Sequence, residues 1–337
     1  MDNQHGGNIT AFAKEIGTHP LEVIDLSSNI NFVKPKIEFD FNTLEISPYP
    51  NYDKLEDALA KRYKIAKEEF ELFNGATSAI YALFSLLKPQ YATLYAPLYL
   101  EYEKALNLTQ GQIEHINRFE DIYKEPKENS LVVFVNPSTP DGKHYDLERL
   151  IKIWIDKDCT IVIDESFLDF TPHKSATSYI KEYSKLYILK SMTKFYSSAG
   201  VRIGVLISTQ KNIQAIKAKE PLWKISEFDS HYLQEALKDK EFKEISDNAH
   251  QESYKKLIEI LEDFPYTDKI YPTDANFMLV KLKGMDAPTL QKKLLPHKIM
   301  IRNCSNFKFL DDSYVRIAIK SGECMGVLEV GLRSIST

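Results

Sequence analysis

The stretch KLYILKSMTKFYSSAGVRIGVLIS (185–208) contains two apolar runs, KLYILK (185–190) and IGVLIS (203–208), separated by a polar turn. Both runs are rich in β-branched and aromatic residues and show almost no polar alternation. This pattern is typical of strands buried on both faces of a mostly parallel sheet. Three further runs have the same character: ATLYA (92–96), SLVVFV (130–135) and CTIVI (159–163).

Segments of helical periodicity lie between these runs, for example ATSAIYALFSLL (76–87) and LERLIKIWI (147–155). The alternation of strand and helix predicts right-handed βαβ units. We therefore expect an α/β fold with a mostly parallel central sheet flanked by helices.

The pattern of apolar and charged residues changes after about residue 225. A long charged helical stretch (231–262) precedes apolar runs at 276–282, 299–304 and 314–320. Helix-like segments lie near 287–295 and 325–335. Together these segments predict a smaller α+β domain. The expected division is residues 1–44 as an N-terminal arm and part of the small domain, 45–225 as a large cofactor-binding domain, and 226–337 as the small C-terminal domain.

Composition narrows the function classes. Hydrophobic residues make up 43% of the 337 residues and charged residues 27%, with a net charge of −5. These values are ordinary for a globular protein, and they argue against non-specific binding of nucleic acid. Cys159, Cys304 and Cys324 have no disulfide or zinc spacing, and the eight histidines show no metal-ligand spacing either. No signal peptide or membrane-spanning run is visible, so we expect a soluble cytoplasmic protein without a metal or a membrane partner.

Four polar groups follow the predicted strands at the edge where α/β sheets bind ligands. Asn136 follows 130–135, Asp164 follows 159–163, Lys194 follows 185–190, and Arg202 immediately precedes 203–208. The sequence thus predicts an amide, a carboxylate, an amine and a guanidinium at one edge of one sheet.

Pyridoxal phosphate (PLP) needs each of these groups. Its aldehyde needs a lysine amine to form a Schiff base, and its pyridine nitrogen needs an aspartate to stay protonated. An asparagine amide can donate to the ring oxygen O3′, and an arginine beside a helix N-terminus suits the phosphate. The expected phosphate site includes the helix start and nearby hydroxyls: Gly75, Ala76, Thr77, Ser191 and Thr193. Each group alone is commonplace, since lysines are usually solvated and Asn-Pro is ordinary turn chemistry; the order of all four carries the prediction.

The segments NPSTPDG (136–142), DESFLDF (164–170) and SMTKFYSSAGVRIG (191–204) resemble the fold-type I PLP enzymes, the class I/II aminotransferases. The resemblance covers nearly the whole chain and implies a fold of the aspartate-aminotransferase type. It implies Lys194 and Asp164 as the catalytic residues, Asn136 at O3′, and Ser191 with Arg202 at the phosphate.

The same resemblance also concerns two tyrosines, and the sequence departs from the family pattern at two places. It implies Tyr99 as the residue that stacks on the cofactor ring, and Tyr49 as a residue that reaches the phosphate in a neighbouring subunit, hence a homodimer. Both could instead serve packing, as the chain has 19 tyrosines. The asparagine turn departs from the usual Asn-Pro-Asn-Asn-Pro-Thr-Gly, and Phe167 replaces a tyrosine that touches O3′ in many relatives.

The ends of the chain resemble the L-threonine-O-3-phosphate decarboxylases of cobalamin biosynthesis more than the histidinol-phosphate aminotransferases. The matching segments are HGGN (5–8), DLSSNIN (25–31), IRNCSNF (301–307) and YVRIAIKS (314–321). This resemblance implies His5, Asn29 and Arg302 around a substrate phosphate, with Arg316 on the α-carboxylate, while Asn136 also faces the substrate. Two arginines on adjacent strands suit a substrate with two anionic groups.

Three alternatives stay open at this point. An aminotransferase of the histidinol-phosphate type would use the same cofactor residues. A serine-phosphate decarboxylase differs by one methyl group in the substrate pocket, which is worth only ~1–3 kcal/mol of discrimination. A non-catalytic binding protein on the same fold is disfavoured because the lysine, aspartate, asparagine and arginine set is intact.

Overall fold

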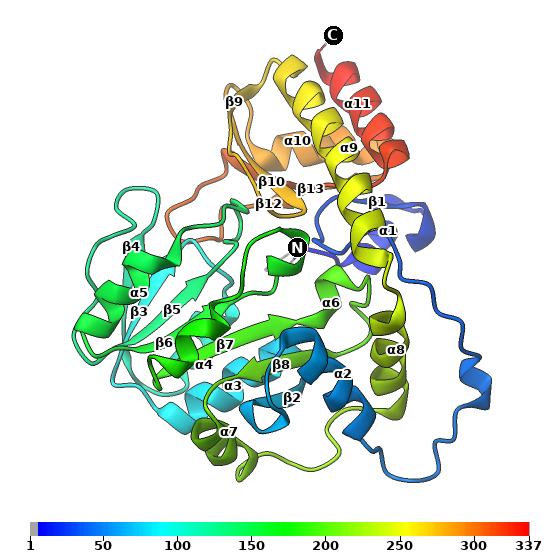
Figure 1. The fold of residues 1–337 in the computed structure, drawn as a ribbon. Helices are drawn as coiled ribbons and strands as arrows, with labels where there is room; N and C mark the ends of the chain where they lie inside the picture. Colours follow the sequence, from blue (N-terminus) through cyan, green and yellow to red (C-terminus); the bar gives the residue numbers. More distant parts are fainter. Residues whose placement is uncertain (1–5, 337) are drawn as a thin grey trace. The chain divides into compact units, whose positions relative to one another are not determined.

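The computed structural model describes residues 6–336, and the chain forms two compact units (Figure 1). Unit 1 comprises the described residues up to Val33, together with Ser138–His144 and the chain from Lys243 onwards. Unit 2 comprises Lys34–Pro137 and Tyr145–Phe242. No helix in the described part of the chain combines the length and the hydropathy of a membrane-crossing segment.

Unit 2 is built on a seven-stranded sheet with the order β2-β8-β7-β6-β5-β3-β4. The pairs from β7 through β6, β5 and β3 to β4 are parallel, whereas β8 is antiparallel to both β7 and β2. The predicted mostly parallel sheet is confirmed. The strands are β2 (Phe70–Asn74), β3 (Tyr91–Ala96), β4 (Gln112–Asn117), β5 (Leu131–Val135), β6 (Thr160–Asp164), β7 (Leu186–Ser191) and β8 (Ile203–Ile207).

Helix α5 shows how a helix of unit 2 packs with one apolar face inward. In α5 the buried residues Leu147, Leu150, Ile151 and Trp154 recur at helical spacing, and the Asp146 side chain caps the first turn by accepting from Glu148 N. The helices are α2 (Asp53–Tyr63), α3 (Gly75–Leu87), α4 (Glu101–Asn107), α5 (Leu147–Asp156), α6 (Met192–Phe195), α7 (Gln210–Lys217) and α8 (Glu227–Lys238).

Unit 1 is an α+β unit with its own apolar core. The four-stranded sheet has the order β12-β13-β10-β9, and β1 pairs separately with β11. The long helix α9 and the last helix α11 lie side by side in Figure 1, and both contribute leucines to the core. The elements are α1 (Ile9–Ile16), β1 (Ile24–Asp25), α9 (Phe242–Asp263), β9 (Thr267–Ile270), β10 (Phe277–Leu282), α10 (Ala287–Leu294), β11 (Ile299–Met300), β12 (Arg302–Asn303), β13 (Tyr314–Ala318) and α11 (Gly322–Ser336).

Two predicted segments are interrupted. The helical stretch 231–262 is two helices, α8 and α9, because the Asp239 carboxylate accepts from the backbone N–H groups of Glu241 and Phe242 and caps a new helix start. The run 299–304 is split into β11 and β12. The Gln291 side chain bonds Ile299 O and Ile301 N at 2.8 Å each, and these backbone groups are therefore not used in one continuous ladder.

The unit boundaries fall at 33/34 and 242/243, whereas the sequence-based division has them at 44/45 and 225/226, and the loop 138–144 groups with unit 1. The N-terminal difference has a local cause. Phe39 and Phe41 of the intervening segment contact His231 of α8, which ties residues 34–44 to unit 2.

Candidate functional site

The register of the sheet in unit 2 brings the predicted groups to one edge. Val135, Asp164 and Leu189 are neighbours across β5, β6 and β7. Because β8 is antiparallel to β7, its first residues lie at this same edge, where Ser191 pairs with Gly204. The C-terminal end of β2 follows in turn, with Asn74 opposite Ile203. Residues 136, 164, 191–194, 202 and 75–77 are therefore gathered by topology.

Asp164 is buried at the end of β6 with its carboxylate fully engaged. Oδ1 accepts from Ser166 N at 2.8 Å and from Ser166 Oγ at 2.5 Å, while Oδ2 accepts from the Tyr102 hydroxyl at 2.7 Å. Burial raises the pKa of Asp164; the hydrogen bonds and the charge of Lys194 act in the opposite direction. The ammonium of Lys194 is thus close enough to act on this carboxylate, as a shared site requires.

Asn136 is fixed beside Asp164 by both its backbone and its side chain. Its N–H donates to Asp164 O at 2.8 Å. Its amide closes a ring with the backbone of Tyr145, accepting from Tyr145 N at 2.8 Å and donating to Tyr145 O at 3.0 Å. These bonds use the amide oxygen and one of the two N–H hydrogens; the second hydrogen can donate to a ligand.

An anion cradle forms at the start of α3. Gly75 has φ +78°, and a Cβ there would lie 2.5 Å from the Arg202 guanidinium, so only glycine lets Arg202 approach the helix start. Gly204 has the corresponding role on β8, because a Cβ there would collide with the backbone of Ala76. The result is a helix N-terminus beside a guanidinium, a combination that suits a phosphate.

Hydroxyls and an aromatic ring complete this edge. Ser191 Oγ and Thr193 Oγ1 are buried and lie 2.8 Å apart. The Tyr99 hydroxyl lies 3.5 Å from Thr77 Oγ1, and burial raises its pKa, with smaller electrostatic effects from Asp164 and Arg202. Tyr99 is therefore near both the carboxylate and the cradle. The residues at this edge fit PLP: they supply an amine, a carboxylate, an aromatic ring, and a cradle that a Cβ at Gly75 would fill.

The sequence-based reasoning missed four residues at this edge. Tyr102 and Ser166 both hold the Asp164 carboxylate. Glu165 forms a buried ion pair with Lys190 at 2.6 Å, and their side chains are 2% and 3% exposed. The signal for Tyr102 was its position three residues after Tyr99, at the start of α4, where its N–H donates to Tyr99 O at 3.3 Å. Glu165 directly follows Asp164, and Lys190 directly precedes Ser191.

Tyr49 and the expected substrate residues lie elsewhere in the chain. Tyr49 belongs to unit 2, is 73% exposed, and stacks on Trp223 with ring centroids 4.1 Å apart. Asn29, Arg302 and Arg316 belong to unit 1, and His5 lies outside the described residues.

The two arginines of unit 1 face each other across β12 and β13, where Arg302 and Arg316 are register partners. Arg316 is 8% exposed and donates only to neutral oxygens, Thr139 Oγ1 at 3.2 Å and Ser27 O at 2.8 Å. No carboxylate among residues 6–336 forms an ion pair with it. Burial lowers its pKa to about 10, and it therefore remains charged at neutral pH.

Asn29 lies in the same unit, in the loop after β1. Its backbone oxygen accepts from Asn276 Nδ2 at 3.0 Å, while its own side-chain oxygen is buried without a hydrogen-bond partner in the described chain. A buried acceptor left unpaired costs free energy, which a hydrogen-bond donor would recover.

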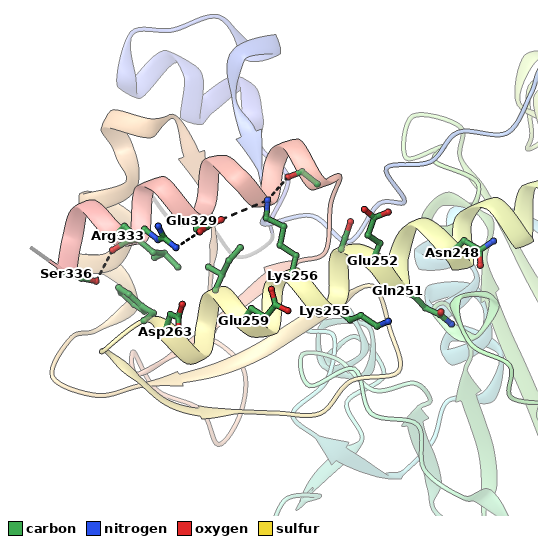
Figure 2. A pocket seen from close by; sticks show the side chains of 15 residues that line it. Asn248, Gln251, Glu252, Lys255, Lys256, Glu259, Asp263, Glu329, Arg333 and Ser336 are labelled. Carbon is green, nitrogen blue, oxygen red and sulfur yellow. Dashed lines mark hydrogen bonds and ion pairs between the residues drawn. The ribbon is translucent and has the colours of Figure 1, made fainter.

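A separate cavity of about 610 Å³ lies in unit 1 between α9 and α11 (Figure 2). Three of its charged side chains pair with one another: Glu329 contacts Arg333 at 2.7 Å and Lys256 at 4.0 Å. None of the predicted site residues lines it.

Residues 22–334 match the family described as aminotransferase class I and II. The chain is 28% identical to the threonine-phosphate decarboxylase of Salmonella typhimurium, over 100% of this chain and 98% of that protein. It is also 28% identical to the adenosylcobalamin biosynthesis bifunctional protein CobDQ of Leptospira interrogans, over 95% of this chain but only 39% of that longer protein.

A solved structure adds to these matches. The histidinol-phosphate aminotransferase from Clostridium acetobutylicum superposes with a TM-score of 0.84 at 30% identity, covering 92% of this chain and 98% of that one. The fold, the enzyme class and the PLP cofactor expected from the sequence are confirmed. The chain belongs to the class I and II aminotransferases, a family of PLP-dependent enzymes.

Proposed function

We propose that this enzyme decarboxylates L-threonine O-3-phosphate to aminopropanol O-2-phosphate, a reaction of cobalamin biosynthesis. The observation that carries the proposal is the pair of buried guanidinium groups of Arg302 and Arg316 on facing strands. A buried guanidinium that donates to neutral oxygens, as that of Arg316 does, is costly unless an anion neutralises it. A substrate with both a carboxylate and a phosphate meets that need, and the Salmonella relative bears the matching name.

In this proposal each residue has a distinct task. PLP, when bound, supplies the electron sink for the bond that breaks at the substrate Cα. Asp164 would hold the ring nitrogen protonated, Asn136 would donate to O3′, and Tyr99 would cover the ring. The helix start 75–77 and Arg202, with Ser191 and Thr193, hold the cofactor phosphate.

The residues proposed to bind the substrate belong to unit 1. Arg316 binds the carboxylate, and Arg302 and Asn29, with His5, bind the substrate phosphate. Lys194 carries the cofactor and moves a proton to or from Cα through its Nζ. Arg302 and Arg316 decide which reaction takes place, because they orient the substrate. By fixing the carboxylate and the phosphate, these residues would select which Cα bond is activated, and a decarboxylase requires that they present the carboxylate bond.

The test is product analysis with PLP-loaded protein. Threonine phosphate is expected to release CO₂ without any 2-oxoglutarate. Serine phosphate, which lacks one methyl group, is expected to react with a kcat/KM lower by about 10–200-fold. Formation of glutamate from histidinol phosphate and 2-oxoglutarate, with no CO₂ from threonine phosphate, would favour the aminotransferase alternative, which the Clostridium structure keeps open.

An arginine variant links the same assay to unit 1. Arg316→Met removes a charge-assisted contact to the carboxylate, so KM for threonine phosphate should rise by roughly 10- to 150-fold. Arg333→Met is the matched control, because that arginine is exposed on α11 and pairs with Glu329. Equal kinetics in the two variants would remove Arg316 from the substrate site.

We further propose a homodimer in which Tyr49 reaches the cofactor phosphate of the second subunit. Its support is an exposed apolar surface in unit 2, formed by Ile46, Tyr49, Leu222 and Trp223. Exposed aromatic and aliphatic side chains in one region mark interfaces. Sedimentation velocity should give a dimer, and Trp223→Glu should shift it toward monomer; a wild-type monomer at micromolar concentration would contradict this.

A further inference from the structure

We propose that Tyr102 is a positioning residue for the cofactor, holding Asp164 as the ionised partner of the pyridine nitrogen through a hydrogen bond to Oδ2. This inference rests on the proposed role of Asp164 and adds a residue to it.

The geometry of Tyr102 is specific. Its side chain is 0% exposed, and its hydroxyl donates to Asp164 Oδ2 at 2.7 Å. The ring packs against Phe84 of α3 and lies edge-on to Tyr99, with centroids at 6.1 and 6.4 Å. The hydroxyl therefore has little freedom to turn away from the carboxylate.

The two carboxylate oxygens of Asp164 accept hydrogen bonds from different residues. Ser166 supplies two donors to Oδ1, and among residues 6–336 Tyr102 alone donates to Oδ2. A carboxylate oxygen has two acceptor positions, and Oδ2 can therefore take one further N–H. Tyr102 thus fixes the oxygen that keeps an acceptor position for the ring nitrogen.

Charge explains why this contact matters. Burial favours the neutral form of Asp164, and the hydrogen bonds from Ser166 and Tyr102 oppose it. Burial and the neighbouring carboxylate raise the pKa of Tyr102 well above its usual range, so it remains a donor. Without this donor the proton shared between the ring nitrogen and Asp164 would move toward the carboxylate, and the ring would accept electrons less well.

The test compares Tyr102→Phe with Tyr95→Phe. Tyr95 is an equally buried tyrosine whose hydroxyl bonds Lys124 O and Trp154 Nε1, both at 2.9 Å, away from Asp164. With ¹⁵N-labelled PLP bound, Tyr102→Phe should shift the ring-nitrogen NMR signal toward the neutral form. It should also raise the dissociation constant of PLP by about tenfold. Tyr95→Phe should leave both unchanged.

The variant Asp164→Asn distinguishes a failure of the role proposed for Tyr102 from a failure of the role proposed for Asp164. If it moves the ¹⁵N signal and Tyr102→Phe does not, Tyr102 has only a packing role and the inference is wrong. If Asp164→Asn itself leaves the signal unchanged, the proposed role of Asp164 fails first. A Tyr102→Phe protein with lowered stability but a wild-type ¹⁵N signal also overturns the proposal.

Discussion

Lys194→Ala is expected to abolish turnover, by about a thousandfold or more, and to remove the visible absorption of covalently attached cofactor. Lys194 follows β7 in the short helix α6, and its charge acts on Asp164, which places its amine at the edge where the cofactor groups gather. An alanine there supplies neither the covalent link nor the proton carrier. Rate measurements and a spectrum of the purified variant check both effects.

Lys185→Ala is the matched control for this prediction. Lys185 directly precedes the same strand, but its side chain is exposed and pairs with Asp158 at 2.7 Å. It should retain wild-type rate and spectrum. The Lys194 variant should still bind PLP weakly, because Arg202 and the start of α3 are intact. Persistence of both turnover and the visible band in Lys194→Ala would contradict the assignment of the lysine.

The central sheet and the order of its site groups could be predicted because their signals are local. A strand buried on both faces needs a continuous apolar run, and the end of each run marks the position of the next polar group. LVVFV in β5 and TIVID in β6 are such runs, followed by Asn136 and closed by Asp164. Topology then brings these ends together without further information.

The groups that hold Asp164 could not be predicted in the same way. Tyr102 reaches it from 62 positions away, and the sequence offers 19 tyrosines for such a contact. The break of 299–304 has a similar origin, because it depends on the Gln291 side chain, which binds the backbone of that segment. Side-chain bonds between distant segments leave no periodic pattern in the sequence.

Lys190→Met should lower the free energy of unfolding by about 3–5 kcal/mol, the largest stability effect expected from one substitution in unit 2. It keeps the apolar stem of the side chain and removes only the charge. Glu165 would then be a buried anion held by Ser175 Oγ at 2.6 Å and Ala176 N at 2.7 Å, without its cation. Urea unfolding of the PLP-loaded protein measures the loss.

The double variant Lys190→Met with Glu165→Leu distinguishes an ion pair from simple packing. Removing both charges eliminates the unpaired anion, so the double variant should be clearly more stable than the sum of the two single losses predicts. Lys185→Met breaks an exposed pair beside the same strand and should cost no more than about 1 kcal/mol. Additive losses in the double variant would mean that Lys190 and Glu165 act independently. In that case their salt bridge would not be what joins the end of β6 to that of β7, where Asp164 and Ser191 lie.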